Sequence, residues 1–232
     1  MPRKYKLSAL AGKIIAIDGP AGSGKSTTAR MVAARLGFRY LDTGAMYRAV
    51  TLLARQAGIS PAEGARLAEL AKTTRFEFRM RDSVNRVLVN GRDVTDEIRS
   101  PEVTQQVSEV SAHAGVRQAL VAQQRKLGRE GSIVAEGRDT TTVVFAHAHV
   151  KVYLDASVRC RAQRRLLDMA RMGVATSLDE QEAEITRRDV YDSSRGNSPL
   201  MRAKDAYLVD TSNMTIEDQV EHVISLIRQV IK

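Results

Sequence analysis

Residues 19–26 read GPAGSGKS, a glycine-rich run that ends in lysine and serine. The spacing fits G-x-x-x-x-G-K-[ST], a loop whose backbone N–H groups surround phosphate oxygens at the start of a helix. In such a loop the lysine bridges the β- and γ-phosphates, and the serine hydroxyl holds Mg²⁺. We therefore predict a nucleoside triphosphate site with Lys25 as a catalytic residue and Ser26 as the metal ligand. Its residues are Gly19, Pro20, Ala21, Gly22, Ser23, Gly24, Lys25, Ser26 and Thr27.

A second polar segment, LDTGAMYR at residues 41–48, follows another short apolar run. It brings Thr43, Tyr47 and Arg48 to the first turns of an expected helix. An arginine in this position can hold a phosphate with two hydrogen bonds. The alternative is that Arg48 is a solvated helix residue.

A third segment, EGRD at residues 136–139, places Arg138 beside Asp139 at the end of an apolar run. Arg138 suits a phosphate. An ionised aspartate only accepts hydrogen bonds, so Asp139 could accept from the exocyclic amino group of cytosine and repel the O4 oxygen of uracil. An internal Arg–Asp pair or a loop cap is the structural alternative.

Short apolar runs and helical stretches alternate along most of the chain. Residues 13–18 precede the glycine-rich loop, and apolar residues at helical spacing follow it from Gly24 to a stop at Gly37. Further strands are expected at residues 38–42, 132–136, 150–155 and 206–210. This order predicts an α/β chain with a P-loop NTPase fold, a five-stranded parallel sheet and helices on both faces. The carboxyl ends of such strands are where ligands bind.

Two segments depart from this alternation. Residues 75–99 alternate apolar and charged side chains around an Asn90-Gly91 turn, which predicts a small antiparallel β insert. Residues 101–129 should form one or two helices, and residues 159–195 hold eight arginines in an expected helical lid. We predict a core at residues 13–73, 101–158 and 197–232, an insert at about 74–100 and a lid at about 159–196.

The composition is that of an ordinary globular protein, with 43% hydrophobic and 27% charged residues. A net charge of +9 calls for a polyanionic ligand, either nucleic acid or nucleotide phosphates. Trp is absent and aromatic residues make up only 4%, which weakens a base-stacking surface for nucleic acid. No apolar run approaches the roughly 20 residues of a membrane span, and residues 1–13 lack a signal-peptide core. The lone Cys160 cannot form an internal disulfide, so we expect a cytoplasmic protein.

A P-loop alone does not separate small-molecule kinases from GTPases, helicases or motor ATPases. The sequence lacks an N-K-x-D motif for guanine and a second basic, aromatic-rich domain for a nucleic-acid motor. A small-molecule kinase is therefore the favoured class.

The joint order of several motifs resembles bacterial cytidylate kinases over nearly all of the chain, from Ile14 to Ile231. Besides GPAGSGKS and LDTGAMYR, these motifs are VNGRDVTDEIRSPEV, AEGRD, VKVYLDAS, RRDVYDSSR and KDAYLVDTSNMTIEDQV. The resemblance implies transfer of the γ-phosphoryl group of ATP, with Mg²⁺, to CMP or dCMP in pyrimidine nucleotide metabolism. We expect these nucleotides as partners, no nucleic acid or membrane, and a monomer.

The resemblance also implies roles for residues at matching positions. The catalytic residues are Lys25, Arg48, Arg138, Arg188 and Arg195. The residues for the acceptor nucleotide are Thr43, Tyr47, Arg48, Ser108, Arg117, Arg138, Asp139, Arg188, Asp192 and Arg195. Three further arginines are candidates for the lid hinge, with a solvated helix face as the alternative: Arg161, Arg164 and Arg165.

The chain departs from the family pattern after Asp139. The family usually has glycine where this chain has Thr141, and Pro-Asp where it has Ala146 and His147. A β-branched threonine lacks glycine's access to positive φ. These differences bear on the geometry of this loop.

Two alternatives stay open. A kinase for UMP or another small substrate would share the P-loop. It would not need a carboxylate that can only accept hydrogen bonds from an amino group of the base. A basic, nucleotide-dependent RNA-binding module would instead use the arginine-rich segment on phosphodiesters.

Overall fold

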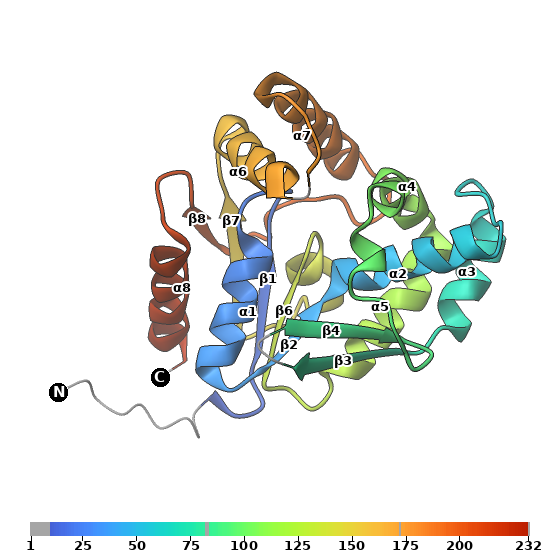
Figure 1. Ribbon diagram of the computed structural model, residues 1–232. Helices are drawn as coiled ribbons and strands as arrows, with labels where there is room; N and C mark the ends of the chain where they lie inside the picture. Colours follow the sequence, from blue (N-terminus) through green and yellow to red (C-terminus); the bar gives the residue numbers. More distant parts are fainter. Residues whose placement is uncertain (1–9, 82–83, 172, 232) are drawn as a thin grey trace. The chain divides into compact units, whose positions relative to one another are not determined.

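The computed structural model describes residues 10–81, 84–171 and 173–231. The chain divides into two compact units, whose helices and strands are shown in Figure 1. The first unit comprises the described residues of Met1–Arg39 and Glu130–Lys232, and the second comprises Tyr40–Arg129. The prediction that residues 1–13 lack a signal-peptide core falls largely outside the described residues, which begin at residue 10. Within the described part of the chain, no helix is both long and apolar enough to cross a membrane.

A five-stranded sheet carries the phosphate-binding loop at its centre. Its order is β2 (Arg39–Asp42), β6 (Ile133–Gly137), β1 (Ile14–Asp18), β7 (Val150–Asp155) and β8 (Tyr207–Asp210). β1 runs parallel to both β6 and β7, and β7 runs parallel to β8. Every residue of β1 is buried, which is why its sequence IIAID does not alternate between apolar and polar positions.

The described residues of the first unit form four α-helices. α1 (Lys25–Leu36) follows the phosphate-binding loop and packs against β6 and α8 (Ile216–Val230). α1 stops at Gly37, which adopts φ 67° and donates its N–H to the last turn of the helix. α6 (Val158–Arg171) and α7 (Leu178–Ser193) lie side by side in Figure 1. They occupy the segment that the sequence predicts as a lid.

The described residues of the second unit form four α-helices and a small sheet. The helices are α2 (Thr43–Gln56), α3 (Gly64–Thr73), α4 (Pro101–Ala112) and α5 (Ala114–Gly128). β3 (Phe76–Arg81), β4 (Val84–Val89) and β5 (Arg92–Asp93) form an antiparallel sheet, followed by the 3₁₀ turn η2 (Glu97–Arg99). Asn90 and Gly91 both have positive φ, as a two-residue hairpin turn requires.

The predicted α/β fold is confirmed, with its five-stranded parallel sheet and its antiparallel insert. The predicted strands differ from the observed ones by at most one residue at either end. Residues 101–129 form two helices, and the short strand β5 is an addition that the alternation did not indicate. The predicted bounds of the core, insert and lid stay a prediction, because the two compact units reflect local packing and not function.

Candidate functional site

The carbonyl oxygens of five successive residues in the phosphate-binding loop each accept a hydrogen bond from a side chain. Arg138 Nη1 donates to Gly19 at 3.1 Å, and Lys25 Nζ donates to Pro20 at 3.4 Å. The remaining three carbonyls accept in the same way: Ala21 from Arg161 Nη1 at 3.1 Å, Gly22 from Arg164 Nη1 at 3.2 Å, and Ser23 from Thr211 Oγ1 at 2.9 Å. With the carbonyls held by these donors, the loop's amide N–H groups are left to bind an anion.

The last glycine of this loop, Gly24, cannot be replaced without strain because of the residues around it. Gly24 has φ 89°, and a Cβ atom there would lie 2.5 Å from Oε1 of Gln219 on α8. The same Oε1 accepts a hydrogen bond from Thr28 in the first turn of α1, at 2.9 Å. A side chain at position 24 would therefore meet both an unfavourable backbone conformation and a fixed buried amide.

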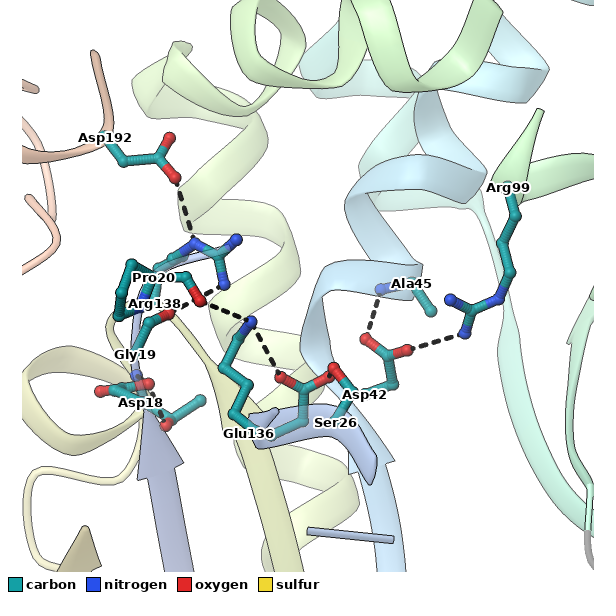
Figure 2. A network of polar contacts seen from close by, with 12 residues as sticks. Asp18, Gly19, Pro20, Ser26, Asp42, Ala45, Arg99, Glu136, Arg138 and Asp192 are labelled. Atoms are coloured by element: carbon teal, nitrogen blue, oxygen red, sulfur yellow. Dashed lines mark hydrogen bonds and ion pairs between the residues drawn. The ribbon is translucent and has the colours of Figure 1, made fainter. Parts of the chain in front are cut away.

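Glu136, the penultimate residue of β6, contacts both residues that end the P-loop motif. Its Oε1 accepts a hydrogen bond from Ser26 Oγ at 2.8 Å, and its Oε2 lies 3.9 Å from Lys25 Nζ (Figure 2). The side chains of Lys25 and Glu136 are only 9% and 4% exposed. A buried carboxylate thus holds the predicted catalytic lysine and the predicted metal ligand together, a role that the sequence analysis did not assign to Glu136.

Arg138 links the phosphate-binding loop to Asp192 on α7. Its Nε donates to Asp192 Oδ2 at 3.1 Å, while its Nη1 holds the Gly19 carbonyl (Figure 2). Asp192 also pairs with Arg195 through its other oxygen. Burial raises the pKa of Asp192, but the guanidinium groups of Arg138, Arg195 and Arg188 outweigh it, so that the pKa lies below its ordinary value. The first unit therefore gathers Arg138, Arg188, Asp192 and Arg195, all four predicted from the sequence.

Replacing Asp192 with asparagine should lower the free energy of unfolding by about 3 kcal/mol at pH 7, because a buried ion pair loses one partner. A carboxylate whose folded pKa is depressed stabilises the fold fully above its unfolded pKa of about 3.9, and this stabilisation is lost as pH falls through the folded pKa. In urea unfolding, the difference in free energy of unfolding between wild type and D192N should be smaller at pH 3 than at pH 7. D168N, at an exposed α6 residue, should change little. A gap that is equal at both pH values would contradict the charge argument.

The loop after Asp139 is organised around the buried carboxylate of Asp18. Thr140 and Thr141 each donate both a backbone N–H and a hydroxyl to it, with Thr141 at 2.7 Å and 2.6 Å. Burial raises the pKa of Asp18 in spite of these hydrogen bonds. Non-glycine residues with positive φ in the described ranges are Asn90, Ser132 and Ser198, so Thr141 needs no such conformation here. Its hydroxyl adds a donor to Asp18 that glycine could not supply.

Asp139 is 3% exposed at the end of β6. Its side chain makes no capping hydrogen bond to the π-helical turn η3 (Thr140–Val144) that follows. The backbone carbonyl of Asp139 instead accepts from the N–H groups of Val143 and Val144.

In the second unit, two residues that the sequence analysis did not predict hold the start of α2. Asp42 caps this helix by accepting from Ala45 N at 2.9 Å, and Arg99 Nη2 lies 3.3 Å from the other carboxylate oxygen (Figure 2). Thr43, the first residue of α2, is buried. Neither Asp42 nor Arg99 was singled out by the sequence analysis.

Arg48, Tyr47 and Arg117 are held by contacts within the second unit. Arg48 Nη1 donates to Thr104 Oγ1 at 2.8 Å and to the Ile98 carbonyl at 3.3 Å, so it is not a freely solvated helix residue. The guanidinium of Arg117 lies over the Tyr47 ring, 5.2 Å from its centroid, and both residues are buried. Ser108 is half-buried on α4.

A sequence model of cytidylate kinases matches residues 15–229 of this chain. The chain belongs to the cytidylate kinase family. A cytidylate kinase from Geobacter sulfurreducens is 45% identical, over 94% of this chain and 94% of its own length. A bifunctional pantoate ligase/cytidylate kinase from Synechococcus sp. strain CC9902 is 49% identical over 93% of this chain. The chain spans only 45% of the length of that bifunctional relative.

Among solved structures, an uncharacterised protein from Eubacterium ventriosum aligns with a TM-score of 0.50. The alignment covers 93% of this chain and 98% of that protein at 13% identity, and it therefore bears on the fold alone. Membership of the cytidylate kinase family was predicted from the order of the motifs and is confirmed by the family match.

Proposed function

We propose that this chain transfers the γ-phosphoryl group of MgATP to CMP or dCMP, giving ADP and CDP or dCDP. The observation that carries the proposal is the P-loop whose five carbonyls are held by side chains, in a chain of the cytidylate kinase family. Phosphoryl transfer needs in-line positioning and neutralisation of charge more than covalent chemistry. A buried lysine and a cluster of arginines supply both.

The proposed roles follow from the charges on the first unit. Lys25 would move from the Pro20 carbonyl and Glu136 to the β- and γ-phosphate oxygens, whose charge it neutralises. Arg138, Arg188 and Arg195 share Asp192 as an anionic neighbour. Phosphate oxygens would compete for the same guanidinium groups when nucleotides bind.

The proposed acceptor residues are drawn from both units on their match to the family motifs. In the first unit these are Arg138, Asp139, Arg188, Asp192 and Arg195. In the second they are Thr43, Tyr47, Arg48, Ser108 and Arg117. We further propose, on the sequence arguments, that the protein works as a cytoplasmic monomer in pyrimidine nucleotide metabolism.

The residues around Ser26 fit a magnesium ion that arrives with ATP. Mg²⁺ prefers oxygen ligands and is usually held by one or two protein groups together with phosphates and waters. The Ser26 hydroxyl and the Glu136 carboxylate, 2.8 Å apart, provide such a pair at the start of α1. Among the described residues, no group of three or more His, Cys, Asp or Glu side chains could hold a metal ion. The phosphates of ATP would complete the coordination. When bound, the ion would neutralise charge on the β- and γ-phosphates.

Replacing Glu136 with glutamine should raise the Mg²⁺ concentration needed for half-maximal turnover by about tenfold, as expected when a group that orients a metal ligand is lost. The amide can still accept from Ser26, so the shape is kept while the charge is removed. E130Q serves as the control, because Glu130 pairs with Arg39 and is 84% exposed. The measurement is initial rate against Mg²⁺ at fixed total ATP. An unchanged Mg²⁺ dependence in E136Q would remove Glu136 from the metal site.

The experiment that tests the proposed function is a coupled assay of ADP release with and without an acceptor. Release should require CMP or dCMP and should stay low with ATP alone. Added RNA should not replace the monophosphate. Turnover that RNA stimulates in the absence of any monophosphate would favour the RNA-binding alternative.

A further inference from the structure

Arg161, near the start of α6, uses its guanidinium to join three separate segments. Only 4% of the residue is exposed. Its Nε donates to the Ala156 carbonyl before the helix at 2.9 Å, and its Nη1 donates to the Ala21 carbonyl of the phosphate-binding loop at 3.1 Å. Its Nη2 lies 2.6 Å from Asp189 Oδ2 on α7. The lid-hinge residue predicted here is therefore buried, and the solvated-face alternative is wrong for it.

The contact between the loop and α6 is also close at the backbone. Gly22 has φ 79°, and a Cβ atom there would lie 3.0 Å from Arg161 Cβ and 3.2 Å from the Arg161 carbonyl. The loop therefore packs directly against the first turn of α6 at this residue. A displacement of Arg161 would be transmitted to Ala21 and Gly22 together.

Asp189 is the acidic partner of Arg161, and their side chains are 24% and 5% exposed, so that the arginine is the more deeply buried charge of the pair. One carboxylate oxygen faces Arg161, while Oδ1 is buried and, among the described residues, has no hydrogen-bond partner. A buried charge that loses its counter-ion carries a large penalty. The pair therefore holds α7 at a defined position relative to the loop.

Two arginines thus connect α7 to the loop in the same way. Arg138 joins Asp192 to the Gly19 carbonyl, and Arg161 joins Asp189 to the Ala21 carbonyl. Asp189 and Asp192 are three residues apart on α7, which places them on one face of the helix. Arg188, a proposed catalytic residue, is the immediate neighbour of Asp189.

We propose that Arg161 is a positioning residue, which fixes the lid helix α7 and its arginines relative to the phosphate-binding loop through Asp189. The inference rests on the proposed phosphoryl transfer. The planar guanidinium presents donors in several directions at once, whereas a lysine ammonium is a single charged point on a flexible stem. Arg161→Lys therefore keeps the charge and removes the three-way connection.

The test compares R161K, D189N and the double variant R161K/D189N with the wild type. Arg159 and Glu182 provide a matched control pair, because they also connect α6 to α7, at 3.3 Å, but are 68% and 31% exposed. The measurements are kcat, KM for ATP, KM for CMP and the melting temperature of each variant. Rates are taken well below the lowest melting temperature.

We expect R161K to lower kcat/KM for ATP by about ten- to a hundredfold, the scale of loss from a small misplacement of reacting groups. KM for CMP should rise as well, since Arg188 on α7 is among the residues proposed to bind the acceptor nucleotide. D189N should lower kcat by about tenfold, and the double variant should be no worse than R161K, as expected for two side chains that act through one contact. R159K and E182Q should match the wild type.

Three outcomes would overturn the proposal. The first is a lower melting temperature for R161K with unchanged kinetic constants, which would make Arg161 merely structural. The second is a double variant whose loss of activity equals the product of the losses in R161K and D189N. The third is a loss of activity in R159K and E182Q as large as that in R161K and D189N. If R161K does not fold, D189N alone decides, because Arg161 is then intact.

A wild type that fails to phosphorylate CMP would instead contradict the proposed function. Arg161 would then be judged on ADP affinity by calorimetry. R161K should weaken that affinity by about tenfold, equivalent to about 1.4 kcal/mol. Unchanged ADP affinity would overturn the inference in that case.

Discussion

Replacing Lys25 with alanine is expected to lower turnover by at least about 10²-fold, the usual effect of removing one electrostatic contact to developing charge. Lys25 is buried beside Glu136 and the Pro20 carbonyl, where it carries a positive charge into the phosphate-binding loop. Its contact with the β- and γ-phosphate oxygens strengthens as negative charge shifts toward the leaving ADP. The effect should therefore fall on kcat more than on KM for ATP.

The measurement is steady-state kinetics with circular dichroism to establish that K25A is folded. K72A is the control, since Lys72 lies on α3 with its side chain 63% exposed and should leave turnover unchanged. Turnover of K25A within about threefold of the wild type, far less than a lost transition-state contact costs, would contradict the P-loop assignment.

Base choice should depend on Asp139. If the Asp139 carboxylate accepts a hydrogen bond from the cytosine amino group, bound UMP would instead place the uracil O4 oxygen, also an acceptor, opposite that carboxylate in a site without water. Sites built around such a bond can reject an analogue by about 10⁴ in kcat/KM, so CMP should greatly outperform UMP. Asp139→Asn can present an amide donor to O4. It should therefore lose efficiency with CMP and narrow the gap to UMP.

The measurement is kcat/KM for CMP and UMP in both proteins, with D168N as a control at an exposed aspartate on α6. A CMP to UMP ratio that is the same in wild type and D139N would show that Asp139 does not read the base. Ser108 and Arg117 would then be the remaining candidates for that role.

Much of the fold could be predicted because its signals are local. A buried parallel strand appears in sequence as an uninterrupted apolar run, as IIAID does in β1, and Gly37 marks the end of α1 by its own conformational freedom. The Asn90-Gly91 turn is likewise determined by two adjacent residues. Each of these features depends on neighbours in the chain.

Features that depend on distant partners could not be predicted in this way. Glu136 contacts Ser26 across 110 residues of chain, and Thr140 and Thr141 reach Asp18 across more than 120. The sequence reveals that Thr141 replaces a glycine, but only the structure shows that its hydroxyl has a buried acceptor. Arg161 is a similar case. It is buried, but the sequence cannot single it out because seven other arginines lie in the same segment.

The most direct test of the proposed function is the identity and amount of product formed from ATP with CMP, dCMP, UMP or AMP. We predict that CMP and dCMP yield CDP and dCDP in equal amounts to ADP when the mixtures are separated by chromatography, and that UMP and AMP yield little. Formation of ADP without a matching nucleoside diphosphate, or a preference for UMP or AMP over both cytidine nucleotides, would contradict the account.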